Sequence, residues 1–219
     1  MIDKKELAKL IDYSLLKADA TQSDIKKLCL SAIKYGTNSI CINPHYVVYA
    51  RNVLKKSKIR ITSVISYPLG ADTTDVKIFA IEKALKDGAN ELDIVMNIGM
   101  FKSKRYDYVL KELKKIVSFA KKIKRDAVVK IIIETGMLTK KEIKKASILV
   151  LKSGADFVKT GTGWSKGATV EDVKIIKSVV NGKIKIKAAG GIRTAEQAEK
   201  LIKAGATRLG ISHIEKILS

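Results

Sequence analysis

Short runs of apolar, mostly β-branched residues recur along the chain and alternate with lysine-rich segments of helical periodicity. Seven runs are clear, and they occupy residues 38–43, 60–66, 91–97, 128–134, 155–159, 183–188 and 207–212. A shorter run at 10–16 precedes the first of the longer helical segments and adds an eighth. Apolar runs of this length between turn residues indicate buried strands, and their alternation with helical segments predicts repeated strand–helix units.

The helix boundaries carry recognisable capping signals. A threonine followed three residues later by an acid or amide forms a capping box, and such pairs occur at 139–142 and 194–197, with weaker aspartate versions at 21–24 and 169–172. Glycines in "YGTN", "DGAN", "SGAD" and "AGAT" stand just before four of the predicted strands, where a helix commonly ends. The signals agree with the strand–helix alternation.

The repeat predicts an α/β fold, specifically a (β/α)8 TIM barrel that occupies residues 1–219 as a single domain. Successive strand centres lie roughly 23 to 37 residues apart, which is the length of one strand–helix unit in such a barrel. An open doubly wound sheet is the alternative. No GxGxxG motif follows the first strand, as a dinucleotide-binding sheet of that kind would require, so the closed barrel is favoured.

Composition narrows the class of protein. Hydrophobic residues make up 46% and charged residues 30% of the chain, and no apolar run approaches the ~18 residues of a membrane span. The N-terminal "MIDKKELAKLIDYS" carries charge where a signal peptide is apolar, which predicts a cytoplasmic protein without a membrane partner. Cys29 and Cys41 form no CxxC motif and do not cluster with His45 or His213, so neither a disulfide framework nor a zinc site is expected.

The net charge of +21 raises the possibility of nucleic-acid binding. The lysines are dispersed over predicted helices and loops without interleaved aromatic residues, as in "KELKK" and "TKKEIKK". This distribution favours a solvated, lysine-rich surface over a specific nucleic-acid site.

Candidate chemistry gathers where strands end. In such barrels the active site lies at the C-terminal ends of the strands, and Lys159 and Lys187 end two consecutive strands. Two lysines facing one crowded interior are expected to lower each other's pKa, and a neutral lysine amine attacks carbonyl carbon. Asp93 interrupts the run "ELDIVMN", so it either forms a buried ion pair with a lysine or takes part in the chemistry.

The spacing of "KIKIKAAGG" places Lys183, Lys185 and Lys187 on one face of a strand. Three lysines cannot all be enclosed. We therefore expect Lys183 near the opposite rim of the barrel, Lys185 toward that end or in a solvated gap, and Lys187 alone at the catalytic mouth.

In (β/α)8 TIM barrels, phosphate is often held by the loops after strands seven and eight. In this chain those loops carry Gly190, Gly191 and Arg193 after one strand, and Gly210 and Ser212 in the other. Uncovered backbone N–H groups near glycine and at a helix start bind anions. The glycines could instead serve only as tight turns.

Ordered motifs over nearly the whole chain resemble those of the deoxyribose-phosphate aldolases. They are "IDYSLLKADAT", "ICINPHYV", "VISYPLGA", "ELDIVMNIG", "KIIIETGMLT", "GADFVKTGTGW" and "KAAGGIRTAEQA". The resemblance implies a class I aldolase on a (β/α)8 barrel that reversibly cleaves 2-deoxy-D-ribose 5-phosphate to D-glyceraldehyde 3-phosphate and acetaldehyde. It implies no cofactor and no metal, and a homodimer or homotetramer.

The resemblance also implies site residues. Lys159 would be the Schiff-base lysine, with Lys187 and Asp93 as the proton-transfer pair. The substrate-binding residues would be Asp12 near the sugar hydroxyls, Thr162 and Gly163 along the sugar and phosphate, and Gly190, Gly191, Arg193, Gly210 and Ser212 at the phosphate.

The chain departs from the family pattern in four respects. Tyr13 and Ser14 replace His-Thr, Gly161 replaces serine, His213 stands where serine or glycine is usual, and the given sequence ends in "KILS" without the C-terminal tyrosine that some members use in proton transfer. Two other classes of function remain open. A different phosphosugar lyase or isomerase would share the phosphate loops, and a non-catalytic polyanion-binding protein would account for the net charge.

Overall fold

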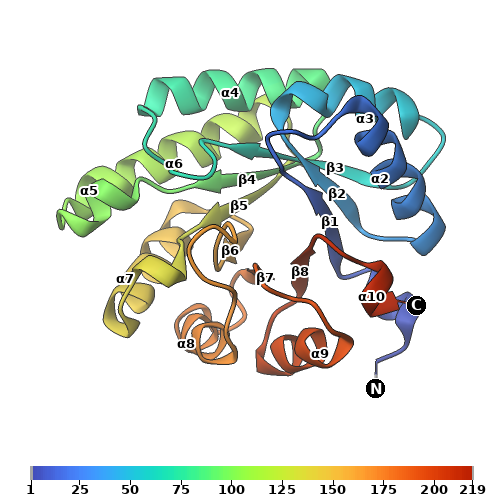
Figure 1. The fold of residues 1–219 in the computed structure, drawn as a ribbon. Coiled ribbons are helices and arrows are strands. Elements are labelled where there is room, and N and C mark those ends of the chain that lie inside the picture. Colours follow the sequence, from blue (N-terminus) through green and yellow to red (C-terminus); the bar gives the residue numbers. More distant parts are fainter. Residues whose placement is uncertain (1, 219) are drawn as a thin grey trace.

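Eight parallel strands close into a barrel surrounded by helices in the computed structural model, which describes residues 2–218 (Figure 1). The strands are β1 (Ile11–Leu15), β2 (Ser39–Ile42), β3 (Arg60–Ile65), β4 (Glu91–Val95), β5 (Val128–Ile132), β6 (Phe157–Lys159), β7 (Lys185–Ala189) and β8 (Arg208–Ile211). Each strand pairs with the next in the chain, and β1 pairs with β8 in the register Asp12 to Gly210. The predicted (β/α)8 barrel is confirmed, and the open sheet is excluded.

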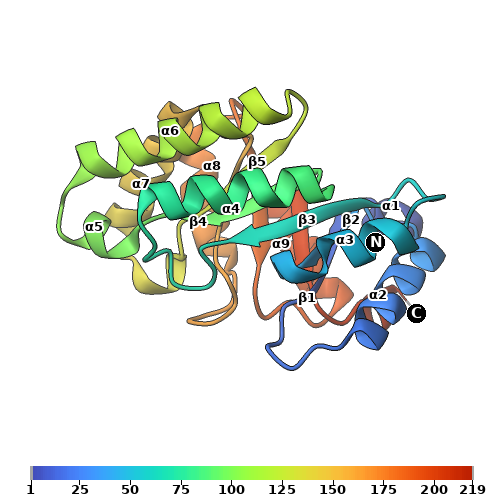
Figure 2. The same ribbon diagram turned by 90° about the horizontal axis from the view of Figure 1, so that it is seen from above.

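Helices follow the strands and form the outer layer (Figures 1 and 2). They are α1 (Lys4–Ala8), α2 (Gln22–Tyr35), α3 (Val47–Val53), α4 (Thr74–Asp87), α5 (Ile98–Lys102), α6 (Tyr106–Ile123), α7 (Lys140–Ser153), α8 (Val170–Val180), α9 (Ala195–Ala204) and α10 (Glu215–Leu218). Short 3-10 turns lie at Pro44–Tyr46 and Thr135–Met137. No helix of the described residues is long and apolar enough to cross a membrane.

The capping signals act as predicted. Complete capping boxes form at Thr21, Thr139 and Thr194. Thr169 accepts a hydrogen bond from the Asp172 N–H and thus forms half of a box. Each cap satisfies backbone N–H groups at a helix start that have no partner inside the helix.

Apolar side chains pack mainly between the barrel and the helices, because alternate strand residues point to opposite faces of the sheet. Leu92 and Ile94 of β4 belong to this fully buried apolar layer. Their neighbours Glu91 and Asp93 are also fully buried but bond to charged groups from other strands. Such barrels are usually filled by branched apolar residues; here the interior holds a network of charges that determines what the mouth of the barrel can do.

Candidate active site

Three residues predicted from the sequence meet at the C-terminal end of the barrel. Lys159 ends β6, Lys187 lies beside it on β7 in register, and Asp93 extends from β4. The Nζ atoms of Lys159 and Lys187 lie 2.6 Å and 2.8 Å from the same oxygen, Asp93 Oδ2. Asp93 and Lys187 are fully buried and Lys159 is 3% exposed. The two interpretations of Asp93 therefore coexist: it is a buried ion-pair partner, and it touches the candidate nucleophile.

A deeper layer of charges supports this group. Lys130 on β5 lies 3.0 Å from Asp93 Oδ1 and 2.6 Å from Glu91 Oε2. Arg208 on β8 lies 2.7 Å from Asp12 Oδ1 and 3.1 Å from Glu91 Oε2. Lys187 donates to Asp12 Oδ2 as well as to Asp93.

Sequence reasoning did not identify Lys130, Glu91 or Arg208 as part of the site. The signal that could have found them is the one that marked Asp93, a charged residue within or at the start of an apolar strand run. Asp12 was predicted to lie near the substrate hydroxyls, but it is fully buried beneath Lys187 and does not line the cleft.

Burial opposes the charged form of each of these groups, and their neighbours overcome it. Despite its burial, Asp12 has its pKa held below the ordinary value by the positive charges of Lys187, Lys130 and Arg208. Likewise, Lys130, Lys159 and Lys187 hold the pKa of buried Asp93 well below its usual range. Both carboxyl groups are therefore ionised at neutral pH.

The expectation that Lys159 and Lys187 lower each other's pKa is wrong for Lys187. Burial does act to lower the pKa of Lys187, but the charges of Asp12 and Asp93 outweigh it and raise that pKa above the ordinary lysine value. The pKa of Lys130 is also raised, because Asp93 and Asp12 outweigh its burial. Both side chains remain ammonium groups at neutral pH.

The charges of the interior can then be counted. Asp12, Glu91 and Asp93 supply three negative charges, and three buried or nearly buried cations pair with them: Lys130, Lys187 and Arg208. Lys159 is a fourth cation in contact with the same network. Among these enclosed groups, which do not include the partly exposed Arg60, the charges sum to zero when Lys159 is a free amine. Arg60 reaches Glu91 from the solvent side, with a side chain 48% exposed.

Lys159 opens onto a cleft of about 340 Å³. Seven predicted substrate-binding residues line this cleft together with Lys159: Thr162, Gly163, Gly190, Gly191, Arg193, Gly210 and Ser212. Lys17, Tyr67 and His213 line it too, and none of the lining residues that the structure describes carries a carboxylate. The cleft is therefore electropositive and suited to an anion.

Two of the glycines are required by a close backbone approach. A Cβ atom on Gly190 would lie 3.0 Å from the Cα of Gly163, and these residues have φ angles of +98° and +88°. Side chains at either position would be strained and would separate the two turns. The glycines therefore bring the loops after β6 and β7 together at the floor of the cleft.

Glu134, which sequence reasoning also missed, holds the loop after β6. Its carboxylate accepts hydrogen bonds from the N–H and hydroxyl of Thr162, at 2.9 Å and 2.6 Å, and from the Ser165 hydroxyl at 2.6 Å. Tyr67 donates to the Thr162 carbonyl oxygen from the other side at 2.7 Å. A Cβ at Gly161 would lie 2.8 Å from Glu134 Oε1, so the glycine at this position leaves room for that carboxylate.

The lysines of β7 and the segment before it lie as their spacing predicts. Lys183 and Lys185 are exposed, and the Lys185 ammonium lies 5.7 Å from the centre of the Phe157 ring. Only Lys187 of the three is enclosed. Within residues 2–218, no group of three or more His, Cys, Asp or Glu side chains has an arrangement that could hold a metal ion.

Comparison with known proteins agrees with this geometry. A family model described as "DeoC/LacD family aldolase" matches residues 3–213. A deoxyribose-phosphate aldolase of Caldicellulosiruptor saccharolyticus is 48% identical over 217 residues, covering 99% of this chain and 98% of the relative. One from Thermococcus kodakarensis is 49% identical over 220 residues, covering 99% and 97%.

Solved structures give the same result. The structure of deoxyribose phosphate aldolase from Aeropyrum pernix matches with a TM-score of 0.91 and 33% identity, covering 99% of this chain and 91% of the other. The structure titled "QR15, an Aldolase" matches with a TM-score of 0.91 and 41% identity, covering 100% and 95%.

Proposed function

The chain belongs to the DeoC/LacD family of aldolases, and from this membership we propose that it is a deoxyribose-phosphate aldolase of the class I, Schiff-base type. It reversibly cleaves 2-deoxy-D-ribose 5-phosphate to D-glyceraldehyde 3-phosphate and acetaldehyde. The observation that carries the proposal is Lys159, a surplus amine in an otherwise balanced charge network that opens onto an electropositive cleft.

The reaction begins when the neutral Lys159 amine attacks C1, the aldehyde carbon of the open-chain sugar. The resulting carbinolamine loses water and becomes an iminium ion, which is a strong electron acceptor. Removal of the proton from the C3 hydroxyl then breaks the C2–C3 bond, and its electron pair moves into an enamine of C1 and C2. Glyceraldehyde 3-phosphate leaves, protonation of C2 restores an iminium, and water releases acetaldehyde and the free amine.

Asp93 and Lys187 are the proton-transfer pair in this proposal. Asp93 Oδ2 lies 2.6 Å from Lys159 Nζ, within reach of the proton that this nitrogen must lose before it attacks. The Lys187 ammonium, 2.8 Å from the same oxygen, keeps a positive charge beside Lys159. A water molecule in the cleft would carry protons to and from the substrate hydroxyls.

The phosphate group would lie at the opposite end of the cleft from Lys159. Gly190 and Gly191 supply backbone N–H groups, and Arg193 and Ser212 add a guanidinium and a hydroxyl to the same wall. Thr162 and Gly163 also line the cleft and would border the sugar. Asp12 acts from beneath the cleft, through Lys187.

Reductive trapping tests the proposal. Borohydride added with acetaldehyde should reduce the imine and leave one ethyl group on Lys159, detected by peptide mass spectrometry. Lys159→Ala and Lys159→Arg should show neither the adduct nor cleavage above about a thousandth of wild type, because alanine lacks an amine and a guanidinium stays protonated. An adduct at another lysine, or full cleavage by Lys159→Ala, would contradict the mechanism.

The wider setting of the enzyme is proposed on the same basis. We propose that residues 1–219 act as one barrel domain, with a phosphosugar substrate and no specific nucleic-acid partner. Buried free thiols at Cys29 and Cys41 are typical of a reducing compartment, which supports the cytoplasm.

A homo-oligomer, dimer or tetramer, is also proposed. The Aeropyrum pernix enzyme is described as tetrameric, and this chain exposes Phe79 by 70% and Val76 by 52% on α4. Light scattering after gel filtration gives the mass directly, and a monomer at micromolar concentration would contradict this part of the proposal.

A further inference from the structure

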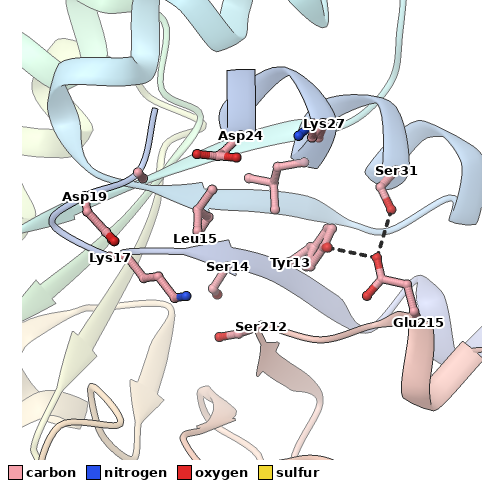
Figure 3. Close-up of a pocket in the computed structure, with 12 residues that line it drawn as sticks. Tyr13, Ser14, Leu15, Lys17, Asp19, Asp24, Lys27, Ser31, Ser212 and Glu215 are labelled. Atoms are coloured by element: carbon pink, nitrogen blue, oxygen red, sulfur yellow. Dashed lines mark hydrogen bonds between the residues drawn. The ribbon is translucent and has the colours of Figure 1, made fainter. Parts of the chain in front are cut away.

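A second cavity, of about 380 Å³, adjoins the active-site cleft. Figure 3 shows the residues that line it. It is bordered by β1, α2 and the segment between β8 and α10, and it shares Ser14, Lys17 and Ser212 with the cleft. The turn that carries Ser212 and His213 therefore stands between two open spaces. Close packing cannot fix the orientation of a wall that has space on both sides, so other contacts must do so.

Tyr13 contacts this turn at both of its ends. Its backbone pairs in register with Ile211, the last residue of β8 before the turn. Its hydroxyl donates a hydrogen bond of 3.1 Å to Glu215 Oε1, at the first residue of α10 after the turn. The Ser31 hydroxyl on α2 reaches the same oxygen at 3.4 Å, and Figure 3 shows both side chains directed toward Glu215.

The surroundings keep this contact intact. Tyr13 is 9% exposed, so its ring position is fixed by packing, whereas Glu215 is exposed and would be mobile without its partners. Burial and the charge of Glu215 raise the pKa of Tyr13 to about 12, so the phenol remains a hydrogen-bond donor over the usual assay range. Ile214, fully buried, anchors the backbone between the turn and Glu215.

We propose that Tyr13 and Glu215 are positioning residues that orient Ser212 and His213 toward the phosphate of the substrate, and so set the preference of the enzyme for phosphorylated over unphosphorylated sugar. This inference rests on the proposed function. Neither side chain touches the substrate in this proposal; both act through the turn. Neither residue lines the cleft that Lys159 opens onto, so we expect the chemical step to be unaffected.

Steady-state kinetics with 2-deoxyribose 5-phosphate and with 2-deoxyribose tests the proposal. In Tyr13→Phe and Glu215→Ala, KM for the phosphorylated sugar should rise about three- to tenfold, the factor for loss of one hydrogen bond. In both variants, kcat for the phosphorylated sugar should stay within about twofold of wild type, and so should kcat/KM for unphosphorylated deoxyribose. Glu215→Gln keeps the acceptor oxygen and should restore the wild-type KM.

The matched control is Tyr106→Phe, which removes a phenol hydroxyl from α6, a helix that packs mainly against α4, α5 and α7. Calorimetric titration with inorganic phosphate gives a second readout that does not depend on turnover, and Tyr13→Phe should weaken that binding by a similar factor. Unchanged KM values in Tyr13→Phe and Glu215→Ala, or equal changes with both sugars, would overturn the inference. Failure of the proposed function would instead appear in the wild type, as an absence of cleavage.

Discussion

At the residue scale, lysine side chains that share one carboxylate, Asp93, differ in their further partners and in access to the cleft. Lys130 and Lys187 remain charged at neutral pH because each contacts at least two carboxylates, whereas Lys159 pairs with one carboxylate of the described residues, Asp93, and lies at the mouth of the cleft. In the proposed mechanism, Lys159 differs from the other two lysines in its number of carboxylate partners and in its access to the cleft. The residue type alone therefore does not distinguish Lys159 from Lys130 and Lys187.

Removal of Lys187 tests how this charge acts. In Lys187→Leu the ammonium beside Lys159 is lost while Asp93 remains ionised, so the charge balance next to the attacking nitrogen changes. We expect borohydride trapping of Lys159 at neutral pH to slow. Because Asp12 and Asp93 lose a buried partner, the free energy of unfolding should also fall by about 3–5 kcal/mol.

The control for that experiment is Lys183→Leu, which changes an exposed lysine just before the same strand. Its trapping profile and stability should match wild type. If Lys187→Leu and wild type are trapped by borohydride at the same rate, Lys187 does not assist imine formation at Lys159. Lys159 could still be the nucleophile in that case.

At the scale of elements, the loop between β6 and α8 illustrates how one strand end can organise its neighbour. Glu134, just after β5, has φ and ψ of 54° and 64°, a left-handed conformation that is uncommon for a residue with a side chain. Its three accepted hydrogen bonds hold Thr162 and Ser165 in place. The energetic cost of this backbone conformation is offset by the hydrogen bonds of Glu134, which fix the loop after β6 in the wall of the cleft.

We therefore expect Glu134→Ala to lower kcat/KM for 2-deoxyribose 5-phosphate by about tenfold or more, the loss typical when substrate-positioning groups are misplaced. The comparison is Glu142→Ala, which removes the acid of the α7 capping box. That change should lower thermal stability, as loss of a helix cap does, but leave kcat/KM unchanged. Equal kinetic effects of the two variants would show that Glu134 has no specific role in the loop.

At the scale of the whole molecule, the charge network joins six strands across the centre of the barrel. It links β1, β4, β5, β6, β7 and β8 through Asp12, Glu91, Asp93 and their cationic partners. A barrel filled with ion pairs depends on every partner, because an unpaired buried charge is strongly destabilising. The stability of the fold is thereby tied to the protonation of its active site.

The dependence of stability on pH follows from the directions of the pKa shifts. For Asp12, Glu91 and Asp93 the folded pKa is lowered, so their contribution is complete above their unfolded values of about 4 and is lost as pH falls below them. For Lys130 and Lys187 the folded pKa is raised, so their contribution persists up to about pH 10 and is lost above it.

Urea unfolding followed by circular dichroism should thus give a constant free energy from about pH 5 to 9 and a sharp loss between about pH 4 and 3. The measurement is best made in about 0.5 M salt, which screens repulsion among the surface lysines but not the buried pairs. A steady change across pH 5 to 9, or full stability at pH 3, would contradict this account.

The sequence by itself determined the local structure and the candidate chemistry. Periodic apolar runs, threonine caps and glycine stops depend on neighbouring residues, so the eight strands and their helices could be predicted from the chain alone. The position of Lys159 at a strand end, and of the glycines after β7, follows from the same local pattern because all parallel strands of a barrel end at one rim.

Only the tertiary structure decided which charges meet. Lys187 and Asp12 are 175 positions apart, and Arg208 and Asp12 are 196 apart, so no spacing in the sequence relates them. Closure of β8 against β1 brings them within hydrogen-bond distance, and that closure reverses the expected direction of the Lys187 pKa shift. The pKa of a buried group depends on distances to its partners in space, and these distances exist only once the barrel has closed.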